Sequence, residues 1–400
     1  ISFLSTNEFG DSLSRPGDIV ELVFTTTESI TIPAVSINGE DANISGDGIS
    51  WSATRMMMEY DSDGPVSFVI DYKDPAGNQG QAVTSLIDSP GVVFDKTPPI
   101  LDDISITVGN ELGYPFAASG DSISLTFSSS EFIYPPDIVL NDAQIEASFI
   151  DSHWVAAVEV ATEDSEGVVG FAIDYRDRSG NIGSQRVSTT DGSGVTIDLT
   201  NATVISVDAY SDDVLIIGDS LIISVFFSEP VLVSGYPQLA LAIGQESRSA
   251  GYIGGTETEL NFVYYVEEGD SVTGLDYANT NSLSISDGYI LDHALNSSDI
   301  ILPEPGSGGS LSADTDILVD GVRPKVLGLT TEDTRDLLGI GDTLAISVNF
   351  SEPVFVEASR LRFALDTGEE DGIAEYVSGS MRSLYQPAGI FLFGYWNYYS

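Results

Sequence analysis

The sequence predicts an all-β chain of tandem antiparallel β-sandwiches in a linear array, and three observations carry this prediction. Alternation of apolar and polar residues dominates the 400 residues, and no long stretch has the period of a helix. Gly, Asp, Asn and Ser punctuate these short runs, as they do at hairpin turns. The third observation is repetition, because the segment 71–78 returns almost unchanged at 174–181 (174 − 71 = 103).

The strands are expected where the alternating runs are richest in β-branched and aromatic residues. Matching strands follow a Gly-Asp pair at 17–24 and, 103 residues later, at 120–127. Two further runs, 221–227 and 344–350, have the same composition. Several short strands in each stretch of roughly 100 residues are typical of an antiparallel sandwich.

The ends of the repeated stretches predict the domain boundaries. Terminal strands followed by an Asp and a short linker occur at 93–99, 195–200 and 317–324, and prolines keep two of these linkers extended. The predicted domains are 1–98, 99–200, a longer one at 201–323 and a partial one at 324–400. Because the fourth loses its likeness to the third near Met381, we expect the tail to be disordered or completed by another chain.

The charge limits the partners. With 14 basic and 62 acidic residues, the formal net charge is −48, which repels nucleic acid and anionic membrane surfaces. The same surface attracts hard cations such as Ca²⁺, although acidity also suits a protein that must stay soluble in salty surroundings. No membrane insertion is expected, because the apolar run at 390–396 is far shorter than the roughly 20 residues that span a bilayer. There is no cysteine, so disulfides and thiolate sites are excluded.

Four features recur in a fixed order: a Gly-Asp before a strand, Phe-Ser-Glu-Pro-Val after it, an Asp-x-x-Gly-Asn turn, and an Asp ahead of a Pro-containing linker. Together they resemble the bacterial Ig-like repeats of large secreted surface proteins and adhesins, although no stretch carries all four unaltered. The resemblance implies Ig-like β-sandwiches, an extracellular or cell-surface location, and service as a stalk, a spacer or an adhesive segment. In some members of that family Ca²⁺ stiffens the joints.

One set of residues has the chemistry of a metal site. Asp and Asn share a turn spacing in three places, and a glutamate closes an early strand in every repeat. The topology that the resemblance implies gathers them with the linker aspartates at two joints. The candidate calcium ligands are Asp95, Glu131, Asp177 and Asn181 at the first joint, and Asp198, Glu229, Asp292 and Asn296 at the second.

The same residues also have an interpretation without a metal. Asp and Asn bond to their own backbone in tight turns and tolerate left-handed geometry, and the glutamates can be solvated strand ends. Both interpretations stay open at this point.

The tryptophans and histidines indicate core packing rather than a catalytic site. Trp51 and Trp154 are 103 residues apart and are expected in the cores of their sandwiches. The two histidines, His153 and His293, belong to different predicted domains, and no phosphate-binding loop or His-Glu-x-x-His motif is present, so an enzyme is not expected.

The sequence therefore predicts an extracellular structural protein, either the stalk of an adhesin or the subunit of a filament, and in the interpretation with a metal Ca²⁺ stiffens its joints. Its expected partners are neighbouring copies of itself or other surface and filament proteins. The alternative is a module whose loops bind a glycan or a protein, for which Tyr236, Tyr252 and Tyr289 are candidates.

Overall fold

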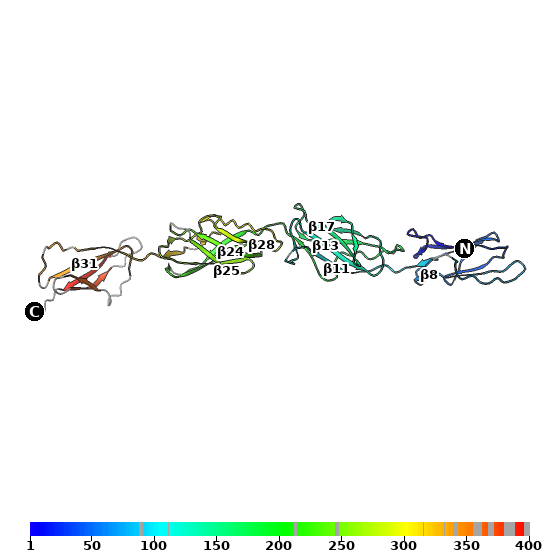
Figure 1. The fold of residues 1–400 in the computed structure, drawn as a ribbon, viewed down its shortest axis with the longest axis horizontal. Coiled ribbons are helices and arrows are strands. Elements are labelled where there is room, and N and C mark those ends of the chain that lie inside the picture. Colours follow the sequence, from blue (N-terminus) through cyan, green and yellow to red (C-terminus); the bar gives the residue numbers. More distant parts are fainter. Residues whose placement is uncertain are drawn as a thin grey trace. The chain divides into compact units, whose positions relative to one another are not determined.

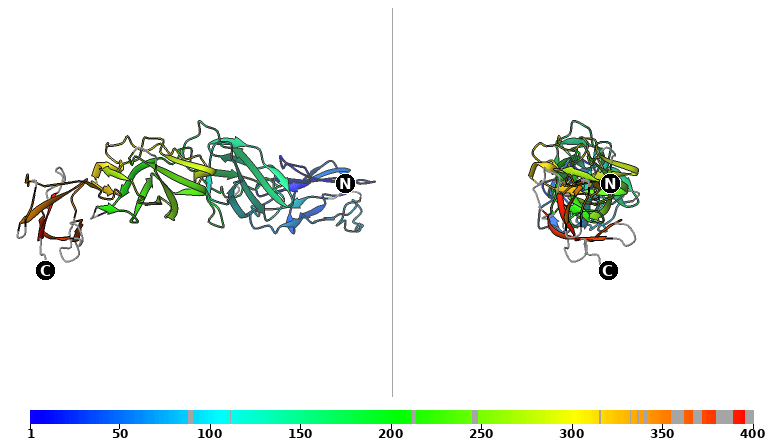
Figure 2. Two further views of the ribbon diagram at one scale, coloured as in Figure 1. Left: turned by 60° about the vertical axis from the view of Figure 1, so that its left-hand side comes forward. Right: turned by 90° about the vertical axis from the view of Figure 1, so that its left-hand side faces the viewer.

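The computed structural model describes residues 1–87, 91–110, 112–211, 214–244, 248–314, 316–331, 333–335, 337–339, 342–354, 362–366, 372–379 and 389–395. This part of the chain contains strands β1 to β34 and one short helix, α1 (Leu311–Asp314) (Figures 1 and 2). Most strand pairs are antiparallel, and the predicted all-β class is confirmed.

The described chain divides into two compact units. The first comprises 1–201 with 291–298, and the second comprises 202–290 with 299–400. Within them lie four hydrophobic clusters, which run from Phe3 to Phe94, Leu101 to Ile197, Ala202 to Val319, and Ile346 to Ala374. We call the four predicted domains repeats 1 to 4, and their boundaries remain predictions.

Repeat 1 contains three small sheets. Their strand orders are β1-β3-β7-β6, β5-β4-β9 and β2-β10-β8. The strands are β1 (Ser2–Ser5), β2 (Leu13–Ser14), β3 (Ile19–Thr25), β4 (Ala34–Ile37), β5 (Glu40–Asp41), β6 (Asn43–Gly46), β7 (Ser50–Met56), β8 (Gly64–Pro65), β9 (Phe68–Asp71) and β10 (Val93–Phe94).

Repeat 2 has the same topology. Its sheets run β11-β13-β17-β16, β15-β14-β19 and β12-β20-β18, and Figure 1 labels β11, β13 and β17 next to one another. The strands are β11 (Leu101–Val108), β12 (Phe116–Ala117), β13 (Ser122–Ser129), β14 (Asp137–Leu140), β15 (Ala143–Ile145), β16 (Ser148–Ile150), β17 (His153–Glu159), β18 (Gly167–Val168), β19 (Phe171–Asp174) and β20 (Thr196–Ile197).

The strand register shows that repeats 1 and 2 are copies at the level of single residues. Phe24 on β3 pairs with Trp51, and Phe127 on β13 pairs with Trp154. All four side chains point into their cores, where Trp51 and Trp154 are 6% and 8% exposed. The predicted packing role of the two tryptophans is confirmed.

Repeat 3 has a six-stranded sheet, β21-β23-β26-β25-β24-β28, and a three-stranded sheet, β22-β29-β27. The strands are β21 (Val204–Ala209), β22 (Leu215–Ile216), β23 (Ser220–Phe227), β24 (Val231–Leu241), β25 (Arg248–Gly255), β26 (Glu259–Tyr265), β27 (Ser271–Thr273), β28 (Leu283–Asp292) and β29 (Leu318–Asp320).

Repeat 4 corrects one expectation. The described residues form one sheet, β30-β31-β34-β33-β32, with β30 (Val326–Thr330), β31 (Thr343–Phe350), β32 (Arg362–Leu365), β33 (Gly372–Gly379) and β34 (Gly389–Tyr395). The expectation that the tail from Met381 onward is disordered or completed by another chain is wrong for 389–395. Here β34 lies between β31 and β33, the place that β26 holds in repeat 3, because pairing needs compatible alternation rather than sequence identity. Residues 381–388 and 396–400 lie outside the described residues.

The recurring Gly-Asp pair has a structural role. Gly17, Gly120 and Gly218 adopt positive φ angles of 95°, 91° and 94°, which glycine reaches without strain. The carboxylate of the following aspartate then accepts a hydrogen bond from the backbone N–H three residues earlier. These bonds measure 2.8 Å for Asp18, 2.9 Å for Asp121 and 2.9 Å for Asp219. The motif therefore closes the turn that leads into the central strand.

Candidate metal centre

The turn at Asp177 positions the central carboxylate of the candidate site. It follows β19, and Gly180 supplies the positive φ of 87° that its reversal needs. The Asp177 Oδ1 atom accepts the N–H of Asn181 at 2.9 Å, and Oδ2 accepts the Asn181 Nδ2–H at 2.8 Å. Asp177 is 0% exposed, so these donors satisfy a fully buried carboxylate.

The other two turns predicted from the sequence repeat this geometry. Asp74 accepts the backbone N–H and the side-chain amide of Asn78 at 2.8 and 2.6 Å. Asp292 accepts the corresponding groups of Asn296 at 2.9 and 3.0 Å, with Leu295 at a φ of 72° where the other turns have glycine. Hydrogen bonds from the asparagine to the aspartate carboxylate stabilise each turn, and they account for the shared Asp-x-x-x-Asn spacing, as the interpretation without a metal requires.

The asparagine also binds the linker that leads into its repeat. Asn181 Nδ2 donates to the backbone carbonyl of Asp95 at 3.0 Å, and Asn296 Nδ2 donates to that of Asp198 at 3.0 Å. Both contacts lie within the first compact unit. Each asparagine thus joins its own turn to the preceding linker through its amide nitrogen.

Three carboxylates meet where the first linker reaches repeat 2. Asp95, Glu131 and Asp177 each present an oxygen, and these oxygens lie within 4.8 Å of one another. Burial raises the pKa of Asp95, and the charge of Asp177 adds to this effect. Burial, followed by the charges of Asp95 and Asp177, raises the pKa of Glu131. The cluster is therefore a half-buried concentration of negative charge, which a hard divalent cation would neutralise.

The second predicted set is divided between the two compact units. Asp198 and Asp292 belong to the first unit and present oxygens within 4.8 Å of each other, whereas Glu229 belongs to the second unit. Burial raises the pKa of Asp198, and the charges of Asp292 and Glu166 add to it. Within the first unit, two of the three predicted carboxylates are therefore brought together.

Two further acids fix the linkers, and sequence reasoning missed them. Asp63 accepts the Lys96 N–H at 2.8 Å and the Thr97 hydroxyl at 2.7 Å. In repeat 2, Glu166 accepts the Leu199 N–H at 2.9 Å and the Thr200 hydroxyl at 2.6 Å. The signal that could have found them is their separation, which is again 103 residues, although one is Asp and the other Glu.

Repeats 1 and 2 also touch through residues that the sequence did not single out. Asn7 Nδ2 donates to the carbonyl of Ser179 at 3.0 Å, and the guanidinium of Arg15 donates to the carbonyl of Gly180. The ring of Phe9 lies 5.7 Å from that of Tyr134, and the guanidinium of Arg176 lies 5.2 Å from the centre of Phe9. The turn at Asp177 thus accepts two hydrogen bonds from repeat 1.

The linker into repeat 4 has a different composition. Burial raises the pKa of Glu352, and the charge of Asp320 adds to this effect. The Glu352 Oε1 atom is buried and has no hydrogen-bond partner among the described residues. Within the described part of repeat 4, no Asp-x-x-x-Asn turn supplies a third carboxylate.

No family model matches the chain, and no curated protein matches it. Among solved structures, the I67–I69 fragment of the titin I-band is 10% identical, with a TM-score of 0.31, and the match covers 70% of this chain and 93% of that one. FdeC, an adhesin of Escherichia coli, is 12% identical, with a TM-score of 0.29 and coverages of 80% and 96%. A tetra-tandem repeat from the extending region of a large adhesion protein is 13% identical, with a TM-score of 0.23 and coverages of 93% and 86%.

The class of these neighbours agrees with the resemblance noted in the sequence, since they are Ig-like domains of adhesins and of titin. At such low identities and TM-scores the likenesses carry no argument about what this chain binds or does. No helix in the described ranges is long and apolar enough to cross a membrane.

Proposed function

We propose that the chain is a structural segment of an extracellular or cell-surface protein. Its Ig-like repeats follow one another as in the stalk of an adhesin or the subunit of a filament, and Ca²⁺ stiffens the joints. The observation that carries the proposal is the first linker, which is fixed by hydrogen bonds and borders three half-buried or buried carboxylates.

The linker contacts support a mechanical role. Asp63 binds the linker from repeat 1, and Asn181 binds it from repeat 2. Bending at this joint would break these bonds and would separate Phe9 from Tyr134. Because each repeat has its own hydrophobic cluster, load can pass from one repeat to the next without unfolding either of them.

The electrostatics of the first joint support calcium as the ion. All the donors of the proposed site are oxygens, which suit a hard cation that takes six to eight ligands. Burial, with the charges of neighbouring carboxylates added to it, raises the pKa values of Asp95 and Glu131 and so works against their charged forms, and a divalent cation would offset this cost.

The test is the melting temperature in Ca²⁺ and in EGTA, with a matched pair of variants. Glu131→Gln replaces one proposed carboxylate ligand with a neutral amide, whereas Glu28→Gln makes the same change 103 residues earlier, where no group of three carboxylates is found among the described residues. At a calcium concentration about 100 times the dissociation constant, we expect about 2.7 kcal/mol of added stability. This gain should shrink in Glu131→Gln and persist in Glu28→Gln. Equal melting temperatures in Ca²⁺ and EGTA would remove the ion from the proposal.

A stalk and a filament subunit differ in whether the chain binds further copies of itself. A filament subunit would bind neighbouring copies of itself, whereas a stalk would be continuous with other parts of a surface protein. Sedimentation at increasing protein concentration separates the two, because end-to-end assembly increases with concentration and a stalk remains monomeric.

An adhesive module that binds a glycan or a protein is the second candidate. It is favoured by a hollow of about 510 Å³ in repeat 2, next to the first joint, that is lined by Phe132, Phe149 and Trp154. Phe132 and Phe149 are 59% and 60% exposed, which is unusual for rings of this size. Binding to a glycan array that is lost in Phe149→Ala would support this candidate, and the absence of binding would count against it.

A further inference from the structure

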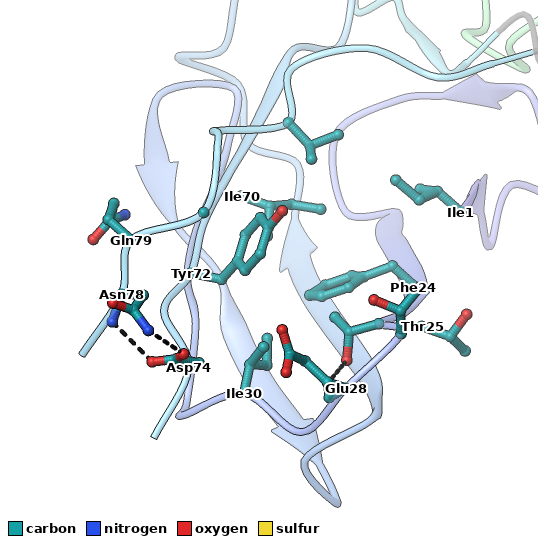
Figure 3. Close-up of a pocket in the computed structure, with 14 residues that line it drawn as sticks. Ile1, Phe24, Thr25, Glu28, Ile30, Ile70, Tyr72, Asp74, Asn78 and Gln79 are labelled. Carbon is teal, nitrogen blue, oxygen red and sulfur yellow. Dashed lines mark hydrogen bonds between the residues drawn. The ribbon is translucent and has the colours of Figure 1, made fainter. Parts of the chain in front are cut away.

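Two exposed phenylalanines of repeat 2 are additions to a fold that forms without them. Phe132 and Phe149 line the hollow of about 510 Å³, and they are 59% and 60% exposed. Their counterparts 103 residues earlier are Ser29 and Gly46. Figure 3 shows the matching end of repeat 1, around Glu28. Because repeat 1 has the same strand topology without either ring, the fold does not account for the two phenylalanines.

Neighbouring side chains hold both rings in place. Phe149 pairs with Trp154 across strands β16 and β17, and the centres of their rings lie 5.2 Å apart. The ring of Phe132 meets that of Tyr134 at 6.1 Å and an angle of 79°, and the guanidinium of Arg178 lies 5.1 Å from the centre of Phe132. A ligand that stacks on these rings would meet surfaces that are ordered before it binds, which lowers the entropic cost of binding.

Arg178 adds an uncompensated positive charge beside the hollow. It is exposed and forms no ion pair with any described residue. Such a cation is unusual in a chain with 62 acidic and 14 basic residues, and its counterpart in repeat 1 is Pro75. Three positions therefore distinguish this place from the same place in repeat 1, and they supply two exposed rings and one unpaired guanidinium.

The local charge, rather than the net charge of −48, decides which ligand this place attracts. At physiological ionic strength, salt screens exposed charges beyond about 8 Å. Glu131 is the only acid among the described residues that line the hollow. Its carboxylate has an oxygen within 4.8 Å of oxygens of Asp95 and Asp177, so it belongs to the acidic cluster that the proposed Ca²⁺ would neutralise. Arg178 remains available to an anion.

We propose that Phe132, Phe149 and Arg178 form a binding site for a sugar residue that carries a carboxylate. The faces of aromatic rings carry partial negative charge and attract the C–H groups on the flat side of a pyranose. The guanidinium fork matches a carboxylate with two parallel hydrogen bonds. The inference rests on the adhesive function named above as the second candidate, and it gives that function a class of ligand.

The shape of the sheet beside the hollow favours a glycan over an acidic peptide. A peptide that bound by adding a strand would need a long free edge. Strand β16, which carries Phe149, is the edge of its sheet and has only three residues. The exposed surface consists instead of ring faces, which suit a ligand made of rings.

The test is calorimetric titration of the intact chain with two carboxylated sugars, each beside its own methyl ester. A hyaluronan hexasaccharide presents uronates within a chain, and α2,3-sialyllactose presents a carboxylate at a chain end. We expect at least one acid to bind about tenfold or more tightly than its ester, because esterification removes the charge that Arg178 recognises and keeps the sugar rings.

Four variants assign the binding to these residues. Arg178→Gln should reduce the affinity for the acid to that for the ester, whereas Arg323→Gln, the same change at an exposed arginine of repeat 3, should alter neither. Phe132→Ser and Phe149→Gly install the residues that repeat 1 carries in the same fold, so both variants should stay folded by circular dichroism. Each should weaken the binding of acid and ester alike, by about tenfold.

Titrations in Ca²⁺ and in EGTA keep this test apart from the calcium proposal, because a preference for the acid in either medium supports the site. Equal affinities of the acids and their esters in both media would overturn it. If Phe149→Gly still weakened the binding of both, the adhesive function would stand with a neutral glycan. A blocked hexapeptide of glutamate that bound as tightly as the sugars would show that charge alone is recognised, and would overturn the proposal. Absence of binding by all four sugars would overturn it as well.

Discussion

Glu28, Asp74 and Asn78 at the end of repeat 1 match Glu131, Asp177 and Asn181 at the first joint, 103 residues later. Among the described residues, only the second set contacts a linker. The turn at Asp74 and the turn at Asp177 have matching hydrogen bonds, so neither the linker nor a metal is needed to form them. What differs is the surroundings. Asp74 is half-exposed and its pKa is lowered by the donors of Asn78, whereas Asp177 is fully buried beside Asp95, whose pKa is raised by burial. The comparison teaches that the linker turns a self-sufficient turn into a crowded acidic site.

The largest expected effect comes from removing the carboxylate of each turn. Asp177→Ala leaves the buried N–H groups of Asn181 without their acceptor, and we expect a loss of about 2–3 kcal/mol. Asp74→Ala makes the same change where water can replace the lost acceptor, and we expect a clearly smaller loss. Urea unfolding of both variants measures the difference. Equal losses would show that burial by the linker does not matter to the turn.

The next effect is a pH dependence of opposite sign at the two places. Asp95 and Glu131 have folded pKa values above the unfolded values of 3.8 and 4.5. They bind protons more tightly when folded, so their contribution to stability is greatest below those values and is lost as the pH rises through the folded values. Asp74 has a lowered pKa, so its contribution is present above 3.8 and is lost as the pH falls.

Melting temperatures in EDTA between pH 4 and pH 7 test this sign. Asp95→Asn should raise the melting temperature near pH 7 and lessen the loss of stability with rising pH, because it removes a partly buried charge that lies beside two like charges. Asp74→Asn should lower the melting temperature slightly near pH 7. A lower melting temperature for Asp95→Asn in EDTA would contradict the inference that the charge of Asp95 destabilises the folded chain.

The smallest effect concerns the linker itself. Asp63→Ala removes the acceptor of the Lys96 N–H and of the Thr97 hydroxyl, and we expect a loss of about 0.5–1.5 kcal/mol at this exposed site. Hydrogen exchange at the Lys96 amide should become faster, while exchange within β3 stays unchanged. Glu166→Ala should have the corresponding effect at Leu199. Exchange at Lys96 that matches the unaltered chain would show that Asp63 does not fix the linker.

Much of this comparison could be predicted from the sequence, because the 103-residue offset places whole strands and turns in register. The roles of Trp51 and Trp154, and the meeting of Asp95 with Glu131 and Asp177, follow from that offset and the implied topology. Asp63 and Glu166 also have this offset, but they were missed because their partners lie in linkers whose course the offset does not give. Arg15 could not be found in this way, because its partner in repeat 2 is the backbone carbonyl of Gly180. The strand at 389–395 was not predicted, because its pairing depends on the alternation of apolar and polar residues, which persists after the sequence likeness to repeat 3 is lost.

The most direct test of the central claim is a crystal structure of the chain grown in the presence of Ca²⁺. The account predicts one ion bound by oxygens of Asp95, Glu131 and Asp177, and none between Glu28 and Asp74, which belong to no group of three carboxylates among the described residues. Anomalous scattering would identify the ion. Well-ordered carboxylates with only water between them at the first joint would contradict the claim.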